Sequence, residues 1–411
     1  MKKVNRVEQQ IIRKNNPIYD VVDQYCFYSK NVYNQANYII RQEFINNNNK
    51  LSAYDVQKLM QSMDCYKECG SQAAQKTIQL VDKMWKSYFK AIKDWKKNPS
   101  KYLGMPKLPK YLPEDGRQVF MLKNIQCSLN NGQFRIAFKP FGGYTVKTHA
   151  VGKLMQCRFV PKAYYYVMEI VYEIEVPETE NIASERIAAI DLGVDNLMTI
   201  TTNCDVSPII INGKPLKSIN QYYNKKISEM RSALKLRNDS DWSNEMQRFT
   251  TKRNNQVDDY IQKSTKMVVN FCKCNDIDTL VCGYNSGWKQ DTNMGKRVNQ
   301  KFVSIPYLSI VQRLEYKCEN EGIKFIKTNE SYTSGTSFLD GEEPIEKNYN
   351  KDRRIHRGLF QSEKGEYINA DVNGSYQIMK KVFPKAFANG IVDAGSHPVV
   401  VNIPLQTANV I

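Results

Sequence analysis

The sequence predicts a multidomain α/β protein, and three patterns along its 411 residues support this class. Apolar residues recur at helical spacing over residues 18–44 and 73–95. Several short stretches between residues 118 and 176 have a period of two, which predicts strands joined by turns. Strands and helices alternate from residue 187 onward, which implies a central sheet. A chain of this length can form two or three domains, each with its own core.

The first half of the chain predicts a small β-barrel that is interrupted by helices. A first strand at residues 4–12 is expected to pair with the strands beyond residue 118. The helical stretch is therefore predicted to be an insertion, joined to the barrel by the Pro- and Lys-rich connector 104–110. The acidic linker 177–184 predicts a domain boundary. The expected domains are a barrel from 1–16 with 104–180, a helical domain at 17–103, and a third domain at 181–411.

The net charge of +17 favours a polyanionic partner. Nucleic acid is the first expectation and an anionic membrane surface the second, although many basic proteins bind no nucleic acid specifically. The 25 tyrosines, interleaved with Lys and Arg, suit stacking on bases. No apolar run has the length of a membrane span, and the basic N-terminus has no apolar core of a secretory signal.

The ten cysteines are expected to be free thiols in a reducing compartment. A structural zinc site needs four ligands in paired spacing. Cys65 with Cys69 and Cys272 with Cys274 are the nearest approaches to such pairs, and neither has a second pair. The three histidines are scattered. Zinc is therefore not expected, and most of the cysteines are predicted to be small buried apolar side chains.

One carboxylate stands out in the second half. The apolar run 187–190 leads directly into Asp191, and a turn and a second β-favouring run, 197–202, follow it. This predicts a β-hairpin with an acid in its first, buried strand. Burying a lone carboxylate is costly unless it is paired or holds a metal ion. Beyond the hairpin, two Lys- and Arg-rich helices within residues 216–271 predict a basic helical hairpin.

Three acids lie where predicted strands or helices begin or end: Asp191, Glu330 after the strand 323–327, and Asp371 at the start of the last long helix. Sites in open α/β sheets gather at strand ends, so these acids can converge. Converging acids suit two Mg²⁺ ions, which serve phosphodiester cleavage and prefer oxygen ligands. Each acid also has an ordinary interpretation. Asp371 could be an N-cap, and Glu330 could be a solvated loop residue.

Four motifs carry a resemblance to a known family: IDLGVDNLMTI, GYNSGWKQ, ESYTSGTSFLDGEEPIEK and INADVNGSYQIMKKVFP. Together with the connector GMPKLPKY, they resemble the TnpB family of transposon-encoded, RNA-guided DNA endonucleases, which is related to compact type V CRISPR effectors. The resemblance extends over essentially the whole chain. It implies a RuvC-like RNase H fold for residues 181–411, a wedge barrel for 1–16 with 104–180, and a helical recognition domain for 17–103.

The resemblance also implies chemistry and partners. It implies Mg²⁺-dependent cleavage with two ions in the RuvC site. It implies a guide RNA from the transposon end and a double-stranded target DNA with a short flanking motif. A cytoplasmic, nucleoid-associated protein of a bacterium or archaeon is expected, with no membrane partner. Its protein partners are not predicted.

This sequence departs from the family in two places. The usual second RuvC acid lies at the end of the strand DTLVC, where this chain has Gly283 and Tyr284. Some members supply a glutamate from the ESYTS segment instead, and Glu330 fits that pattern. The resemblance therefore implies Asp191, Glu330 and Asp371 as catalytic metal ligands, with Asn373 as a supporting residue.

The second departure is the zinc-finger segment. Gly335 and Thr336 stand where a cysteine is expected, and residues 331–371 contain no cysteine. A metal-free, zinc-finger-like segment at 331–370 is therefore predicted.

The resemblance places Gln75 where the family reads the motif beside the target, and glutamine can pair with adenine in the major groove. Tyr54, Ser71 and Gln72 are further candidates, and Lys107 and Lys110 of the connector are candidate contacts to nucleic acid. An ordinary polar helix start would explain the glutamines equally well.

The sequence is compatible with three functional hypotheses. An RNA-guided endonuclease is the main prediction. A nuclease-dead, RNA-guided DNA-binding repressor is the alternative, favoured by Gly283 and the missing zinc finger. A transposase or guide-independent nuclease is the third, and no DNA-joining motif supports it.

Overall fold

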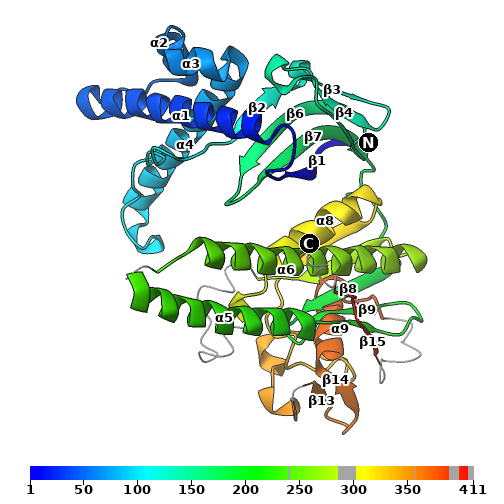
Figure 1. Cartoon of the computed structure of the whole chain (residues 1–411). Helices are drawn as coiled ribbons and strands as arrows, with labels where there is room; N and C mark the ends of the chain where they lie inside the picture. Colours follow the sequence, from blue (N-terminus) through cyan, green and yellow to red (C-terminus); the bar gives the residue numbers. More distant parts are fainter. Residues whose placement is uncertain (239–240, 286–301, 357, 388–397, 406–411) are drawn as a thin grey trace. The chain divides into compact units, whose positions relative to one another are not determined.

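The computed structural model describes residues 1–238, 241–285, 302–356, 358–387 and 398–405. The chain forms two compact units, Lys3–Glu175 and Val176–Ile411, the latter joined by the first two residues. Figure 1 gives the elements of both. No helix in the described parts of the chain is long and apolar enough to cross a membrane.

The unit Lys3–Glu175 combines a group of helices with two small sheets. One sheet has the strand order β1-β7-β6-β2 and the other β3-β4-β5. The helices are α1 (Tyr19–Asn47), α2 (Ala53–Met60), α3 (Asp64–Cys69), α4 (Ser71–Lys97) and the 3-10 turns η1 (Pro99–Lys101), η2 (Asn124–Gln126) and η3 (Lys139–Phe141). The strands are β1 (Lys2–Ile12), β2 (Phe120–Lys123), β3 (Cys127–Asn130), β4 (Gln133–Ile136), β5 (Thr145–Lys147), β6 (Lys153–Pro161) and β7 (Tyr166–Val176).

Helices and strands of this unit share one hydrophobic core. Tyr25 of α1 packs its ring against Phe120 of β2 and against Phe138 and Phe141 of the β4–β5 connection. Aromatic pairs at these separations add stability beyond the area that they bury. The helical stretch is therefore packed into the same core as the strands on either side of it.

The prediction of a single small barrel is wrong in its hydrogen bonding. The first strand does join the later strands, since β1 lies beside β7. The strands of residues 1–176, all of them described, nevertheless form two sheets of four and three strands. The 3-10 turn η2, which lies between β2 and β3, interrupts the run of strands at the point where one sheet would have to continue into the other.

The connector is held along α1 by side chains of that helix. Asn37 and Arg41 donate to the carbonyl oxygen of Pro109 at 3.2 and 2.8 Å. Asn34 exchanges two hydrogen bonds with the backbone of Leu112. These bonds satisfy backbone groups that a loop rich in Pro cannot pair by itself.

The unit Val176–Ile411 is built on a six-stranded sheet with the order β12-β11-β8-β9-β10-β15. Its strands are β8 (Ile187–Leu192), β9 (Asn196–Thr202), β10 (Ile209–Asn212), β11 (Thr279–Gly283), β12 (Lys324–Thr328) and β15 (Val399–Val401), with a separate hairpin of β13 (Leu359–Gln361) and β14 (Tyr367–Asn369). Its helices are α5 (Lys214–Asn238), α6 (Asn244–Cys274), α8 (Tyr307–Asn320), α9 (Ala370–Val382) and the 3-10 turns η4 (Glu346–Asn348) and η5 (Lys351–Arg353). The predicted β-hairpin at Asp191 and the basic helical hairpin are confirmed.

Strand direction changes across this sheet. Strands β8, β9 and β10 run antiparallel to one another in sequence order. On the other side of β8, strands β11 and β12 run parallel to it. The carboxyl ends of β8, β11 and β12 therefore meet at the same edge of the sheet.

The two faces of the sheet are covered by different helices (Figure 1). Ala188 and Ile190 of β8 belong to the larger core with α6 and α8. Ile187 and Ala189 belong to the smaller core with α9. Because side chains alternate along a strand, Asp191 lies on the α9 face with Ile187 and Ala189.

The segment predicted to be a metal-free zinc-finger remnant has an aromatic core that it shares with α9, and an ion pair of its own. Phe338 stacks on Tyr376 of α9 with ring centroids 4.4 Å apart. Phe360 and Ile368 of the β13–β14 hairpin lie in the same small core. Arg353 pairs with Glu342 at 2.6 Å. A ring of Tyr349 lies so close to Gly335 that any side chain at that position would collide with it.

Candidate active site

Three strand ends bring the predicted acids together. Ile190 of β8 is level with Cys282 of β11, so Asp191 follows at the level of Gly283. Gly283 in turn is level with Thr328 of β12. Glu330 comes two residues after that strand ends. Two of the three acids are thus delivered to one sheet edge by the register of parallel strands.

The third acid comes from helix α9. Asn369 is the N-cap of this helix, because its Oδ1 accepts from the backbone N–H groups of Asp371 and Val372. The alternative that Asp371 caps the helix is therefore wrong. The Asp371 side chain does not cap the helix. It accepts from Asn196 Nδ2 at 2.7 Å and from the Arg354 guanidinium at 3.1 Å.

Helix α9 is pressed onto the end of β8. Ser375 Oγ donates to the carbonyl oxygen of Ala189 at 2.9 Å. A Cβ atom at Gly374 would lie 2.9 Å from Asp191 Oδ2, so the glycine lets the carboxylate lie against the helix. The first turn of α9 is in this way fixed beside Asp191.

The three acids share an intermediate exposure in otherwise buried surroundings. Asp191 alone among the six residues of β8 is not fully buried. Asp371 is followed in α9 by eight buried residues, Val372 to Met379. Glu330 is also partly exposed. The sequence predicted an acid in a buried strand, and Asp191 is the partly exposed residue of β8, whose other five residues are buried.

Burial raises the pKa values of two acids in the cluster, and repulsion between the carboxylates adds to the effect on Asp191. Burial raises the pKa of Asp191 well above its usual range, and repulsion from Glu330 and Asp371 raises it further. Burial raises the pKa of Glu330 to about 8, while the ammonium of Lys381 acts in the opposite direction. Arg354 likewise lowers the pKa of Asp191. The acids are thus close enough to repel one another.

The donor chemistry of the cluster fits Mg²⁺. All three side chains offer carboxylate oxygens, which Mg²⁺ prefers to sulfur or nitrogen. Glu330 Oε2 is buried, as is Thr199 Oγ1 on the strand beside Asp191, and neither has a hydrogen-bond partner within the described chain. Unpaired buried oxygens are costly, and a bound cation would relieve that cost.

The cluster is not closed around an ion. Within the described residues, no group of three or more His, Cys, Asp or Glu side chains is placed to hold a metal ion. Asp371 uses both its oxygens, one on Asn196 and one on Arg354. Each of these oxygens keeps a second lone pair. A metal ion at Asp371 would therefore have to share the carboxylate with the Arg354 cation or displace it.

Gly283 explains how the sheet edge accommodates Glu330. A Cβ atom at position 283 would lie 3.2 Å from Glu330 Oε2 and 2.6 Å from Ile378 Cδ1. The backbone of Gly283 does not adopt the left-handed conformation, so the glycine is favoured by lack of space, and a larger residue would force Ile378 or Glu330 to move. The Glu330 carboxylate, which follows β12, lies beside the space that a side chain at position 283 of β11 would fill.

Replacing Gly283 with alanine should destabilise this unit by about 1–3 kcal/mol, because the added methyl group overpacks a filled space. Ile378→Val removes the Cδ1 atom that lies nearest. The double variant should therefore be more stable than the two single effects predict, by about 1 kcal/mol. Thermal unfolding of the four proteins measures this coupling, and simple additivity would contradict the steric argument.

Asn373 does not support the acids. Its Oδ1 accepts from the backbone N–H of Phe338 at 2.9 Å and its Nδ2 donates to the carbonyl oxygen of Thr336 at 2.8 Å. It is fully buried. Asn373 therefore anchors the 336–338 loop to α9, and its predicted place beside the metal ligands is wrong.

The polar groups that contact the acids were not predicted from the sequence. Asn196 and Arg354 bind Asp371, and Lys381 lies near Glu330 while donating to the carbonyl oxygen of Ser331 at 2.9 Å. Lys381 follows Asp371 by ten residues on the same helix, so helical periodicity was the one signal available. The part of GYNSGWKQ from Ser286 onward lies outside the described residues.

The candidate nucleic-acid contacts lie on the other unit. Gln75 Oε1 accepts from Lys123 Nζ at 3.0 Å, so the oxygen of this amide is already engaged. Gln72 Oε1 is buried without a partner in the described chain, and Ser71 is exposed at the first position of α4. Tyr54 is 63% exposed. Lys107 and Lys110 are exposed on the connector.

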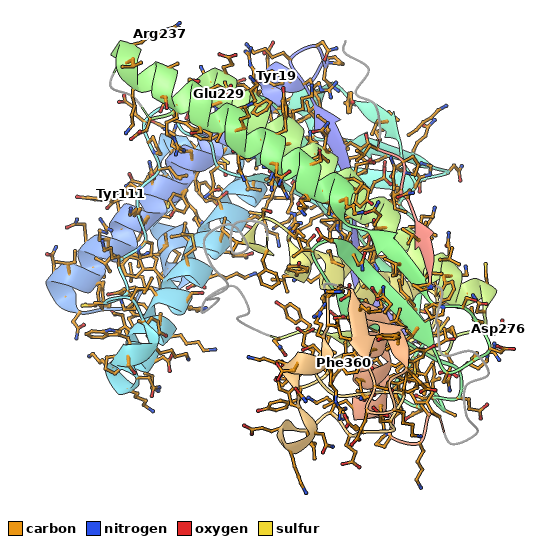
Figure 2. The ribbon with its side chains drawn as sticks, turned by 90° about the horizontal axis from the view of Figure 1, so that it is seen from below. Tyr19, Tyr111, Glu229, Arg237, Asp276 and Phe360 are labelled. Atoms are coloured by element: carbon orange, nitrogen blue, oxygen red, sulfur yellow. The ribbon has the colours of Figure 1, made fainter. Side chains whose placement is uncertain are left out.

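The basic helical hairpin of α5 and α6 has an exposed cationic surface. Glu229 and Arg237 lie about two turns apart along α5 (Figure 2). The exposed cations of the two helices include Lys225, Arg231, Lys235, Arg237, Arg248 and Lys252. Arg253 is different, because its guanidinium binds Asn220 and the carbonyl oxygen of Ser304 within the unit. Tyr222 is 59% exposed beside these cations and offers a stacking surface.

Two family matches cover the parts of the chain that carry the acids. Residues 169–289 match the OrfB_IS605 family, described as a probable transposase, and include Asp191 and Gly283. Residues 307–378 match the TNB domain of Cas12f1-like proteins and include Glu330 and Asp371. Together they define a transposase-type protein with a Cas12f1-like TNB domain. The chain belongs to the TnpB family of RNA-guided, RuvC-type nucleases.

Solved structures give a loose overall likeness. One Cas12f1–sgRNA–target DNA complex superimposes with a TM-score of 0.37 at 17% identity, over 91% of this chain and 98% of that chain. A CRISPR–Cas12f ternary complex gives a TM-score of 0.37 at 16% identity, over 87% and 80% of the two chains. No curated protein matches this chain.

Proposed function

We propose that this protein is an RNA-guided DNA endonuclease that cleaves DNA beside a short flanking motif. The convergence of Asp191, Glu330 and Asp371 at one sheet edge carries the proposal. Acids held together at this cost, with an unpaired buried oxygen among them, suit a divalent cation and phosphodiester hydrolysis.

The topology of the sheet supports a RuvC-like, RNase H-type nuclease domain at residues 181–411. An antiparallel meander, β8 to β10, is followed by parallel strands β11 and β12. In this proposal, residues 17–103 recognise the motif beside the target, and residues 1–16 with 104–180 form the wedge. The segment 331–370 replaces a zinc finger with the pair Arg353–Glu342 and an aromatic core.

Asp191, Glu330 and Asp371 would hold Mg²⁺. The bound ions would activate the attacking water and stabilise the leaving oxygen of the phosphodiester. The protein contributes the positions of the ligands: the register of β8 with β11 fixes Asp191, and the cap at Asn369 fixes the first turn of α9. Gly283 leaves the space in which Glu330 reaches the edge.

The exposed cations of the α5–α6 hairpin suit a nucleic-acid backbone. In an RNA-guided effector, base pairing reads the target, and protein contacts read the flanking motif and the duplex shape. Gln75 remains a candidate for reading the motif, provided that it exchanges Lys123 for a base.

A nuclease-dead, RNA-guided repressor is the second candidate. It is favoured by one observation, the engagement of Asp371 by Asn196 and Arg354, which leaves no preformed ligand group among the described residues. A dead relative would bind guide RNA and target DNA and leave the DNA intact. The two candidates therefore differ in cleavage and agree in binding.

When the gene is expressed together with the DNA that flanks it, the protein should co-purify with one specific RNA from the same locus. The physical reason is the surface charge. The cations of the basic hairpin repel one another, and bound RNA would neutralise them. Sequencing of the co-purified RNA, at salt concentrations that remove non-specific RNA, tests this expectation.

Replacing Arg231, Arg237 and Lys252 together with glutamine should release that RNA at lower salt, because three phosphate contacts would be lost. Substituting the exposed lysines Lys347, Lys351 and Lys364, which lie outside the hairpin, provides a control of equal charge. Recovery of the wild-type protein with no specific RNA would rule out the guided function.

A further inference from the structure

The acidic cluster contains its own counter-ions. Three carboxylates meet two cations, Arg354 beside Asp371 and Lys381 near Glu330. Lys381 is anchored to the backbone of Ser331. Arg354 differs, because its guanidinium makes no other hydrogen bond within the described residues than the one to Asp371 Oδ1 at 3.1 Å.

The position of Arg354 suits a cation that must be able to leave. Its side chain is 39% exposed, while that of Asp371 is 25% exposed. It follows the turn η5 and precedes β13, and Asp371 is the one ion-pair partner of its guanidinium among the described residues. Its charge acts on Asp191 as well as on Asp371, so it offsets repulsion where a metal ion would.

A metal ion and this guanidinium compete for one oxygen. Mg²⁺ requires its ligands at about 2.0–2.1 Å in octahedral geometry, which leaves no room for a hydrogen bond from Arg354 to the same lone pair. Two cations on one carboxylate also repel each other strongly when little water screens them. The other oxygen of Asp371 already accepts a hydrogen bond from Asn196, so the repulsion between the two cations carries the competition.

We propose that Arg354 is the resident counter-ion of the metal-free site, and that it and a divalent metal ion are alternative partners of Asp371. This inference rests on the proposed metal-binding function of the three acids. Metal loading then displaces the Arg354 guanidinium into solvent, and Arg354 opposes metal binding until it is displaced. It also explains why the acids come together without forming a closed ligand group.

Mn²⁺ binding to the nucleic-acid-free full-length chain tests the proposal, with free Mn²⁺ measured by electron paramagnetic resonance. Arg354→Gln should bind Mn²⁺ about tenfold more tightly than the wild type, equivalent to about 1.4 kcal/mol. Arg354→Lys keeps the charge and should stay close to the wild type. Lys351→Gln removes an exposed charge three residues away and should have no effect.

The outcomes separate this proposal from the one on which it rests. If Arg354→Gln binds Mn²⁺ no more tightly than the wild type, Arg354 does not compete and the inference is wrong. If the wild type binds no Mn²⁺ that Asp191→Asn removes, the metal site itself is wrong. A structural role for Arg354 would weaken binding in both Arg354 variants, which is the opposite of the expected order.

A second measurement needs no variant. An arginine-specific dicarbonyl reagent, read by mass spectrometry, should label Arg354 of the wild type faster when Mg²⁺ is added. The neighbouring Arg353, which is paired with Glu342 and 19% exposed, is the internal reference and should not change. Unchanged labelling of Arg354 under conditions where Mn²⁺ binds would overturn the exchange.

Discussion

Glu330→Gln should reduce Mg²⁺-dependent cleavage of guide-matched DNA by about 10³-fold, the upper range for losing one preorganised electrostatic group. The substitution keeps the shape of the side chain and removes its charge. The strand that ends at Gly283 provides no acid, and we expect Glu330 to take the place of that acid. Its Oε2 is buried without a partner in the described chain. An amide there would still fit the space and would be a poorer ligand for Mg²⁺.

The effect should be confined to the chemical step. The Glu330→Gln protein should retain its guide RNA and bind target DNA with unchanged affinity, because none of the hydrogen bonds of Glu330 within the described residues is to the basic hairpin. Glu346→Gln, at an exposed glutamate in η4, is the matched control and should cleave like the wild type. If Glu330→Gln cleaves at the wild-type rate, Glu330 is not a ligand and the second acid must be sought elsewhere.

The metal-free protein should lose stability as the pH rises from about 5 to 8, by about 1–3 kcal/mol after allowance for solvent screening. The pKa of Glu330 is raised, mainly by burial, from an ordinary 4.5 to about 8. A folded state with a raised pKa holds its proton more tightly than the unfolded chain. The stability that this provides is complete below the ordinary value and is lost as the pH passes through the folded one.

Saturating Mg²⁺ should remove most of this loss, because the cation takes the place of the proton in offsetting repulsion. Melting temperatures in EDTA and in Mg²⁺, at each pH from 5 to 8.5, measure the two curves. Asp191→Asn should raise the melting temperature in EDTA near pH 8, since it removes one of the three repelling charges. A metal-free melting temperature that rises over this pH range would contradict the geometry of the cluster.

The sequence predicts the elements of this site well, because they are local. The apolar run before Asp191, the turn after it and the start of α9 each depend on residues within one short window. The basic helical hairpin is equally legible from its periodicity and charge. The role of the three acids as metal ligands stays a prediction.

What the sequence could not predict depends on contacts between distant residues. Arg354 reaches Asp371 only because the β13–β14 hairpin folds back toward α9. Nothing in the sequence indicates that Gln75 has a partner, and Lys123, 48 residues further along the chain, donates to its amide oxygen. The prediction of a single barrel was wrong because the pairing of short strands depends on packing around a shared core, which involves distant residues.

Single-turnover cleavage of guide-matched DNA by the purified protein–RNA complex, with and without Mg²⁺, tests the central claim most directly. Cut DNA is expected only when Mg²⁺ and a matched target are both present, and none is expected with Asp191→Ala or Glu330→Ala. A wild-type complex that binds the target tightly and leaves it uncut at saturating Mg²⁺ would contradict the endonuclease and support the repressor.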